Sequence, residues 1–209
     1  MKKLEIGDKD FFNNLFKNGL IKDFIQIKDK NVDIAYKFTL NQKNYKRNYD
    51  NWETAWHGTI IQNLNSIIKY GLQIQGTKLE NGRYTPKTKY KHPEFIRGIK
   101  NWENAIFASD KLYFAKYYSA NKIRCILEVK MKPDNYTRHD PYIDEPPACV
   151  CFEEGYFMNE IIYRISSQEN IIVNSIILIN DEFIEDILNL EDDIERYGKY
   201  IKIENILKS

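Results

Sequence analysis

Two segments of the sequence carry apolar side chains at every second position, and this pattern constrains the fold more than any other feature. The segments are residues 32–40 and 123–131. A period of two places one set of side chains on one face of an extended strand and the intervening set on the other. Each segment is therefore predicted to be a strand with one face against a core, so the chain must build a sheet.

The other apolar patterns predict further strands and several helices. Strands are expected at residues 105–108, 160–165, 171–179 and 200–203. Helical spacing predicts helices over residues 10–27, with an interruption near Gly19, over 110–119 and over 181–197. Strands and helices do not alternate regularly, so we expect an α+β fold with mainly antiparallel pairing rather than a doubly wound parallel sheet.

Residues 55–72 combine a short apolar strand, a histidine–glycine pair and an amphipathic helix. We expect the strand to end in a glycine turn that carries His57. Thr59 is placed to cap the following helix, and Gly71 is placed to end it. The segment therefore presents His57 between two regular elements.

Charge and hydropathy exclude several classes of function. The 209 residues include 31 basic and 30 acidic side chains, for a formal net charge of +1. No global field draws such a chain to DNA or to an anionic membrane, so nucleic acid could bind only at a local patch. The apolar segments are far shorter than the roughly 20 residues that span a bilayer, so no membrane partner is expected.

The first residues and the cysteines bear on compartment and metal binding. Asp8 and Asp10 stand where a secretory signal has its apolar segment, so we expect a cytoplasmic protein, or one delivered into another cell without a classical signal peptide. Cys125, Cys149 and Cys151 fit no disulfide framework. They form no four-ligand set with the scattered histidines, so no metal is expected.

Three short motifs, in order, resemble the poly(ADP-ribose) polymerase-like ADP-ribosyltransferases of the H-Y-E type. Trp56–Thr59 and the helix through Leu72 resemble the first family motif, a histidine–glycine pair at a strand followed by a helix. Ala105–Asp110, followed by a helix with tyrosines near its end, resembles the second. Asn159–Tyr163 resembles the third, a glutamate that opens a strand. The resemblance covers residues 52–180.

The resemblance implies a role for each matching residue. His57 would hydrogen-bond the adenosine ribose of NAD, and the backbone of Gly58 would bind the nicotinamide amide. Tyr118, or alternatively Tyr117, would stack on the nicotinamide ring. Glu160 would bind the nicotinamide ribose and stabilise the oxocarbenium-like cation that forms when the glycosidic bond breaks. The catalytic residues would thus be Glu160 and His57.

The same resemblance places Thr59, Phe107 and Ser109 at the NAD site. Phe107 stands where the family usually has a tyrosine, so the ring is kept and the hydroxyl is lost. Ala115 stands where the family has a small hydroxyl residue, and Ser109 is the alternative for that contact.

The implied fold is an ADP-ribosyltransferase-like split β-sandwich of two mainly antiparallel sheets with flanking helices. Residues 1–51 would form an N-terminal helix and strand packed on a catalytic domain of residues 52–209. The implied activity is that of an NAD-dependent mono-ADP-ribosyltransferase, an enzyme of the glycosyltransferase class. It would move ADP-ribose from NAD to a protein acceptor and release nicotinamide. NAD is then a substrate.

Other interpretations of the same residues stay open. The related RNA 2′-phosphotransferases share the fold and also consume NAD, and the basic residues of 78–100, within the polar stretch 76–104, could bind RNA. An NAD glycohydrolase would hydrolyse NAD without a protein acceptor. The losses at Phe107 and Ala115 favour a degenerate module that binds NAD or ADP-ribose without turnover. Without the motifs, His57 would be an ordinary turn histidine and Glu160 a solvated carboxylate at a strand edge.

Overall fold

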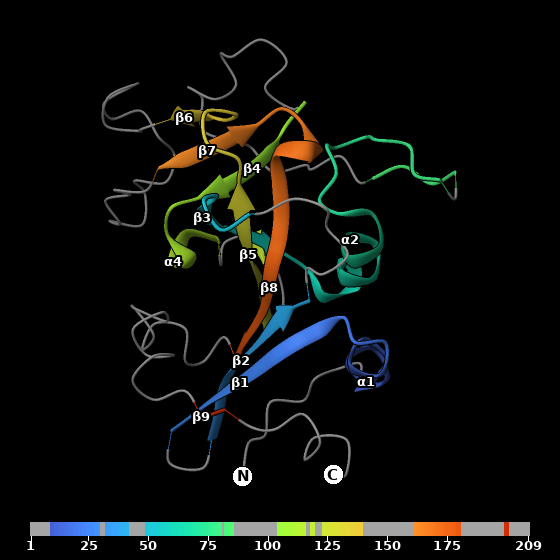
Figure 1. Cartoon of the computed structure of the whole chain (residues 1–209), viewed down its shortest axis with the longest axis vertical. Helices are drawn as coiled ribbons and strands as arrows, with labels where there is room; N and C mark the ends of the chain where they lie inside the picture. The colour runs from blue at the N-terminus through green and yellow to red at the C-terminus, as the bar shows by residue number, and fades with distance from the viewer. Residues whose placement is uncertain are drawn as a thin grey trace.

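The fold is an α+β arrangement built on a nine-stranded sheet (Figure 1). The computed structural model describes residues 9–29, 32–41, 49–80, 82–85, 104–115, 118–119, 123–139, 161–180 and 199–200. Its strands are β1 (Ile21–Asp29), β2 (Val32–Leu40), β3 (Glu53–Thr59), β4 (Ile106–Ser109), β5 (Ile123–Met131), β6 (Thr137–His139), β7 (Ile162–Ile165), β8 (Ile171–Asn180) and β9 (Lys199–Tyr200). Its helices are α1 (Lys9–Lys17), α2 (Leu64–Tyr70) and α4 (Leu112–Ala115), with 3₁₀ turns η2 (Ile61–Asn63) and η5 (Gln168–Asn170).

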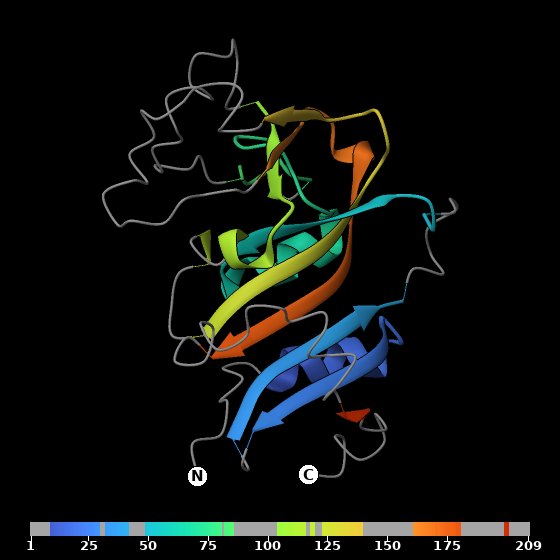
Figure 2. The same ribbon diagram turned by 90° about the vertical axis from the view of Figure 1, so that its left-hand side faces the viewer.

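Every strand pair in the described part of the chain is antiparallel. The strand order is β6-β7-β4-β3-β5-β8-β2-β1-β9, and Figure 2 shows it running along the long axis of the molecule. The predicted α+β class and antiparallel pairing are confirmed. Where two sheets were expected, the strands form one hydrogen-bonded sheet, but β3 and β4 share a single residue pair, Trp56 with Ser109. The sheet is therefore two well-paired parts joined at one narrow place.

Helices cover both faces of this sheet. Figure 1 shows α1 and α2 on one side of the strands and α4 on the other. The larger apolar cluster includes Phe12 of α1, Leu64 of α2 and Phe38 of β2, all buried. The smaller cluster includes Ala115 of α4 and Ile126 of β5. Both faces of the central strands are therefore buried.

The N-terminal elements differ from the prediction in one respect. The expected helix over residues 10–27 ends at Lys17, and Gly19 follows with φ of 64°, which starts the turn into β1. Residues 21–27 are therefore in a strand, not a helix. Phe24 stacks on Tyr36, while Ile25 and Ile27 are buried as well. Because both faces of β1 carry buried apolar residues, the alternation that marks a half-exposed strand is absent from its sequence.

The strands that follow, up to residue 180, agree with the predicted bounds or differ from them by one or two residues. The strands expected at residues 32–40, 105–108, 123–131, 160–165 and 171–179 correspond to β2, β4, β5, β7 and β8. The expected helix at 110–119 is described as α4 over Leu112–Ala115, and the strand expected at 200–203 is described as β9 over Lys199–Tyr200. The helix predicted at 181–197 lies outside the described residues. In the described part of the chain no helix is long and apolar enough to cross a membrane.

Candidate functional site

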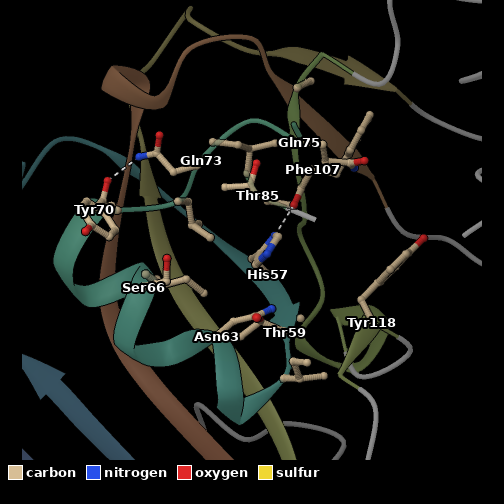
Figure 3. Close-up of a pocket in the computed structure, with 18 of the residues that line it drawn as sticks. His57, Thr59, Asn63, Ser66, Tyr70, Gln73, Gln75, Thr85, Phe107 and Tyr118 are labelled. Atoms are coloured by element: carbon tan, nitrogen blue, oxygen red, sulfur yellow. Dashed lines mark hydrogen bonds between the residues drawn. The ribbon is translucent and has the colours of Figure 1, made fainter. Parts of the chain in front are cut away.

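A cavity of about 850 Å³ opens where β3 and β4 stop pairing. Its lining comes from both faces of the sheet: Ser66 and Tyr70 of α2 lie on one side, and Ala115 and Tyr118 lie on the other. Figure 3 shows the ring of His57 between α2 and β4. The cavity therefore passes through the narrow junction of the sheet rather than lying on one surface.

His57 lies inside β3, not in a turn as the sequence predicted. Its Nδ1 is 2.7 Å from the backbone oxygen of Phe107 on β4. A carbonyl oxygen can only accept, so Nδ1 must carry the proton. Burial lowers the pKa of His57, and the hydrogen bond to Phe107 opposes this effect only in part. The ring is therefore neutral near pH 7, and its Nε2 is an acceptor on the wall of the cavity.

The hydrogen bond of His57 lies where the short β3–β4 ladder ends. The N–H of Asp110 donates to Ile161, so alternation turns Phe107 and Ser109 toward β3. The next ladder pair after Trp56 and Ser109 would join Gly58 to Phe107; β3 and β4 do not form that pair, and the side chain of His57 contacts the Phe107 oxygen. The same alternation directs the N–H and C=O of Gly58 toward this gap. A donor and an acceptor thus stand side by side at the opening.

Gly58 is required by close packing on the opposite face. A Cβ at this position would lie 1.9 Å from the backbone oxygen of Ala115 and 2.9 Å from the Cβ of Tyr118. No side chain fits there, because α4 and the turn after it lie directly on the glycine. The packing brings Tyr118, the predicted ring for nicotinamide, to the edge of the same gap.

The charged residues that line the cavity are all basic. They are Lys69 of α2 and Arg83, and no aspartate or glutamate is found among the described lining residues. Tyr70 raises the pKa of Lys69, first through a side-chain hydrogen bond, and Glu80 adds to the effect. Neutral polar groups from α2 and the segment after it complete the wall, among them Asn63, Ser66 and Gln73. This lining favours a polar ligand that carries negative charge.

A tight hairpin after α2 forms the outer wall of the cavity. Lys78 and Tyr84 form an isolated antiparallel bridge, and Thr85 ties the base together. The Thr85 hydroxyl donates to the Ile74 oxygen at 2.8 Å and accepts the N–H of Thr77 at 2.9 Å. The hairpin holds Tyr84 at the cavity with 65% of its surface exposed. Its residues lack any periodic apolar pattern, so the sequence predicts neither a strand nor a helix here.

Six of the predicted site residues line the cavity: His57, Gly58, Thr59, Phe107, Ser109 and Tyr118. Glu160 and Tyr117 lie outside the described residues. Thr59 ends β3 and does not cap α2, because η2 intervenes and Asn63 is the cap residue; the amide of Asn63 donates to the Thr59 hydroxyl. The hydroxyl of Ser109 accepts the N–H of Lys111, so its contact in the structure is local.

No cluster of metal-ligating side chains occurs among the described residues. The described lining of the cavity is polar and carries two basic side chains. No protein-family model matches the chain, and a search of curated proteins found no match either. Any functional conclusion must come from the geometry of the site itself.

Proposed function

We propose that this protein is an NAD-dependent mono-ADP-ribosyltransferase with an ADP-ribosyltransferase-like split β-sandwich. The proposal assigns the 850 Å³ cavity to NAD and Glu160 to catalysis. The observation that carries it is the gap between β3 and β4, where His57 and the backbone of Gly58 meet the cavity.

The order of the strands supports the proposal. The three motifs of the sequence resemblance lie far apart in the chain, at residues 56–59, 105–110 and 159–163. The strands β3, β4 and β7, which carry or adjoin these motifs, are neighbours in the sheet. A chance set of three motifs has no reason to fall on adjacent strands. A shared site draws its residues from neighbouring strands in this way.

The chemical groups at the gap complement NAD. Along one edge a carboxamide presents an N–H donor and a carbonyl acceptor, which match the C=O and N–H of Gly58. The Nε2 of neutral His57 can accept a hydrogen bond from a ribose hydroxyl. Tyr118, whose Cβ packs beside Gly58, adds an aromatic side chain to the lining of the cavity. Lys69 and Arg83 supply positive charge for a pyrophosphate.

Catalysis in the proposal depends on an ionised carboxylate at Glu160. Loss of nicotinamide leaves positive charge on the ribose, and a fixed carboxylate in a water-poor site stabilises that charge most in the transition state. The acceptor side chain then attacks the ribose carbon and completes transfer. In the proposal the acceptor is a protein, modified in the cytoplasm or in a cell into which the enzyme is delivered without a classical signal peptide.

The test is nicotinamide release from NAD, measured with wild type, Glu160→Gln and His57→Ala. Glu169→Gln is the matched control, because Glu169 is exposed on η5 and is not a lining residue. We expect Glu160→Gln to lose about 100-fold or more in kcat, as one electrostatic group at a transition state commonly supplies. The control should keep wild-type rates. Wild type that releases no nicotinamide, even with lysate as acceptor, rules the enzyme out.

Labelled NAD separates the alternatives in the same experiment. Label on protein indicates transfer, whereas free ADP-ribose alone indicates a glycohydrolase. Binding of NAD without turnover indicates the degenerate module. The presence of Lys69 and Arg83 at the cavity also favours a phosphorylated RNA as a second candidate substrate. Removal of a 2′-phosphate from an oligoribonucleotide, dependent on NAD, would identify the phosphotransferase.

A further inference from the structure

Asp110, one residue beyond β4, holds the backbone of Ile161 with two hydrogen bonds. Its Oδ1 accepts the N–H of Ile161 at 2.8 Å. Its own N–H donates to the Ile161 oxygen at 3.1 Å. The two residues come from distant parts of the sequence, so these bonds fix one segment against another.

The register of the sheet shows what is unusual about this pair. β4 and β7 pair Ser109 with Ile162, so Asp110 and Ile161 are the next pair of the same ladder. In a regular ladder the N–H of Ile161 would donate to the backbone oxygen of Asp110. Here the side-chain carboxylate is the acceptor instead. A charged acceptor makes a stronger bond than a neutral carbonyl does.

The carboxylate also contacts the hydroxyl of the preceding residue, Ser109. The hydroxyl of Ser109 lies 3.5 Å from Asp110 Oδ1 and accepts the N–H of Lys111 at 3.1 Å. Ser109 is buried and pairs with Trp56, the neighbour of His57. A continuous set of contacts thus runs from the gap at His57 to the backbone of Ile161.

We propose that Asp110 is a positioning residue for Glu160. This inference rests on the proposed function, which assigns the catalytic carboxylate to Glu160. Ile161 directly follows Glu160 in the sequence. The two hydrogen bonds from Asp110 fix the backbone of Ile161, and with it the point at which the chain leaves Glu160 and enters β7. Asp110 needs no contact with substrate for this role.

The role predicts a specific pattern of kinetic effects in nicotinamide release. Asp110→Ala should lower kcat by about 10- to 100-fold, because small displacements of a catalytic group carry losses of this size. The KM for NAD should change less than about 3-fold, since the binding groups at His57 and Gly58 are untouched. Asp110→Asn keeps an oxygen acceptor, so its kcat should be close to that of wild type. Asp110→Glu keeps the charge but displaces the acceptor, so its kcat should be as low as that of Asp110→Ala.

A double-mutant cycle tests whether the effect acts through Glu160. In the Glu160→Gln background, Asp110→Ala should lower kcat by less than about 3-fold further, because the group it positions is already gone. A residue that merely stabilises the fold would lower kcat in both backgrounds equally. If Asp110→Ala fails to fold, Asp110→Glu completes the cycle in its place.

The outcomes distinguish this inference from the proposed function. An active wild type, a kcat loss rescued by Asn and non-additivity with Glu160→Gln would support the positioning role. An active wild type with additive effects, or with unchanged kcat in Asp110→Ala and Asp110→Glu, would overturn the positioning role alone. A wild type that does not turn over NAD would overturn both.

Discussion

The substitution Gly58→Ala tests the packing at the gap most directly. The added Cβ would lie 1.9 Å from the Ala115 oxygen, and ordinary contact begins at 3.4 Å. The obstacle is a backbone atom, so α4 must retreat by about 1.5 Å or the strand must bend. Overpacking of a well-packed interior costs about 1–3 kcal/mol, and more where the neighbour cannot yield. We expect the free energy of unfolding to fall by about 3 kcal/mol.

Gly82→Ala is the matched control for this substitution. Gly82 has φ of 78°, so an alanine there is strained, but nothing lies within 4 Å of the added Cβ. Its expected cost is about 1 kcal/mol, from backbone strain alone. Thermal unfolding should therefore show a loss of about 6–12 °C for Gly58→Ala and about 2–4 °C for Gly82→Ala. A loss at Gly58 no larger than that at Gly82 would refute the packing argument.

Three further predictions concern titration, a buried ion pair and the hairpin. Burial lowers the pKa of His57, so the unfolded chain binds more protons than the folded chain, and the free energy of unfolding should fall as pH drops below about 6.5. Denaturant titrations at pH 5 and 8 should show a smaller difference in the free energy of unfolding between the two pH values for His57→Phe than for wild type. Lys37→Met should lower the free energy of unfolding in urea by about 3–5 kcal/mol, because Glu128, whose side chain is 8% exposed, loses its cation. The double variant Lys37→Met, Glu128→Leu should recover most of this loss, because no buried charge is left unpaired. Tyr84 lines the cavity, where its ring could stack on the nucleotide. Tyr84→Ala should then weaken ADP-ribose binding in calorimetry by about 5-fold or more, whereas Tyr84→Phe should bind as wild type does. Equal losses of affinity in the two variants would contradict stacking.

The sequence predicted the strands best where one face of the strand is apolar and the other polar. β2 and β5 have the expected bounds, and the short apolar segment of β4 was found as well. β1 was misassigned because Ile25, Gln26 and Ile27 are all buried, which removes the period of two. Fully buried strands and helices differ little in pattern over so few residues, so only tertiary context separates them.

The candidate site divides in the same way between what local sequence determines and what folding brings together. His57 and Gly58 were identified because they belong to a short motif, but their place inside β3 was not, since a glycine usually suggests a turn. The gap itself depends on three strands and on the hydrogen bond from His57 to Phe107, residues 50 positions apart. No local pattern encodes that bond.

The hydrogen bond of His57 gives one side chain two tasks that can be separated. Its Nδ1–H donates to the backbone oxygen of Phe107, a hydrogen bond worth about 1 kcal/mol. Its Nε2 is the acceptor that the ring keeps for a ligand, since His57 lines the cavity. Asn at this position could still donate to the Phe107 oxygen, but its shorter side chain offers no acceptor at the position of Nε2. The free energy of unfolding of His57→Asn should therefore stay closer to the wild-type value than that of His57→Phe, while both variants should lose NAD binding. An equal fall in the two variants would show that the hydrogen bond to Phe107 is not what holds the gap open.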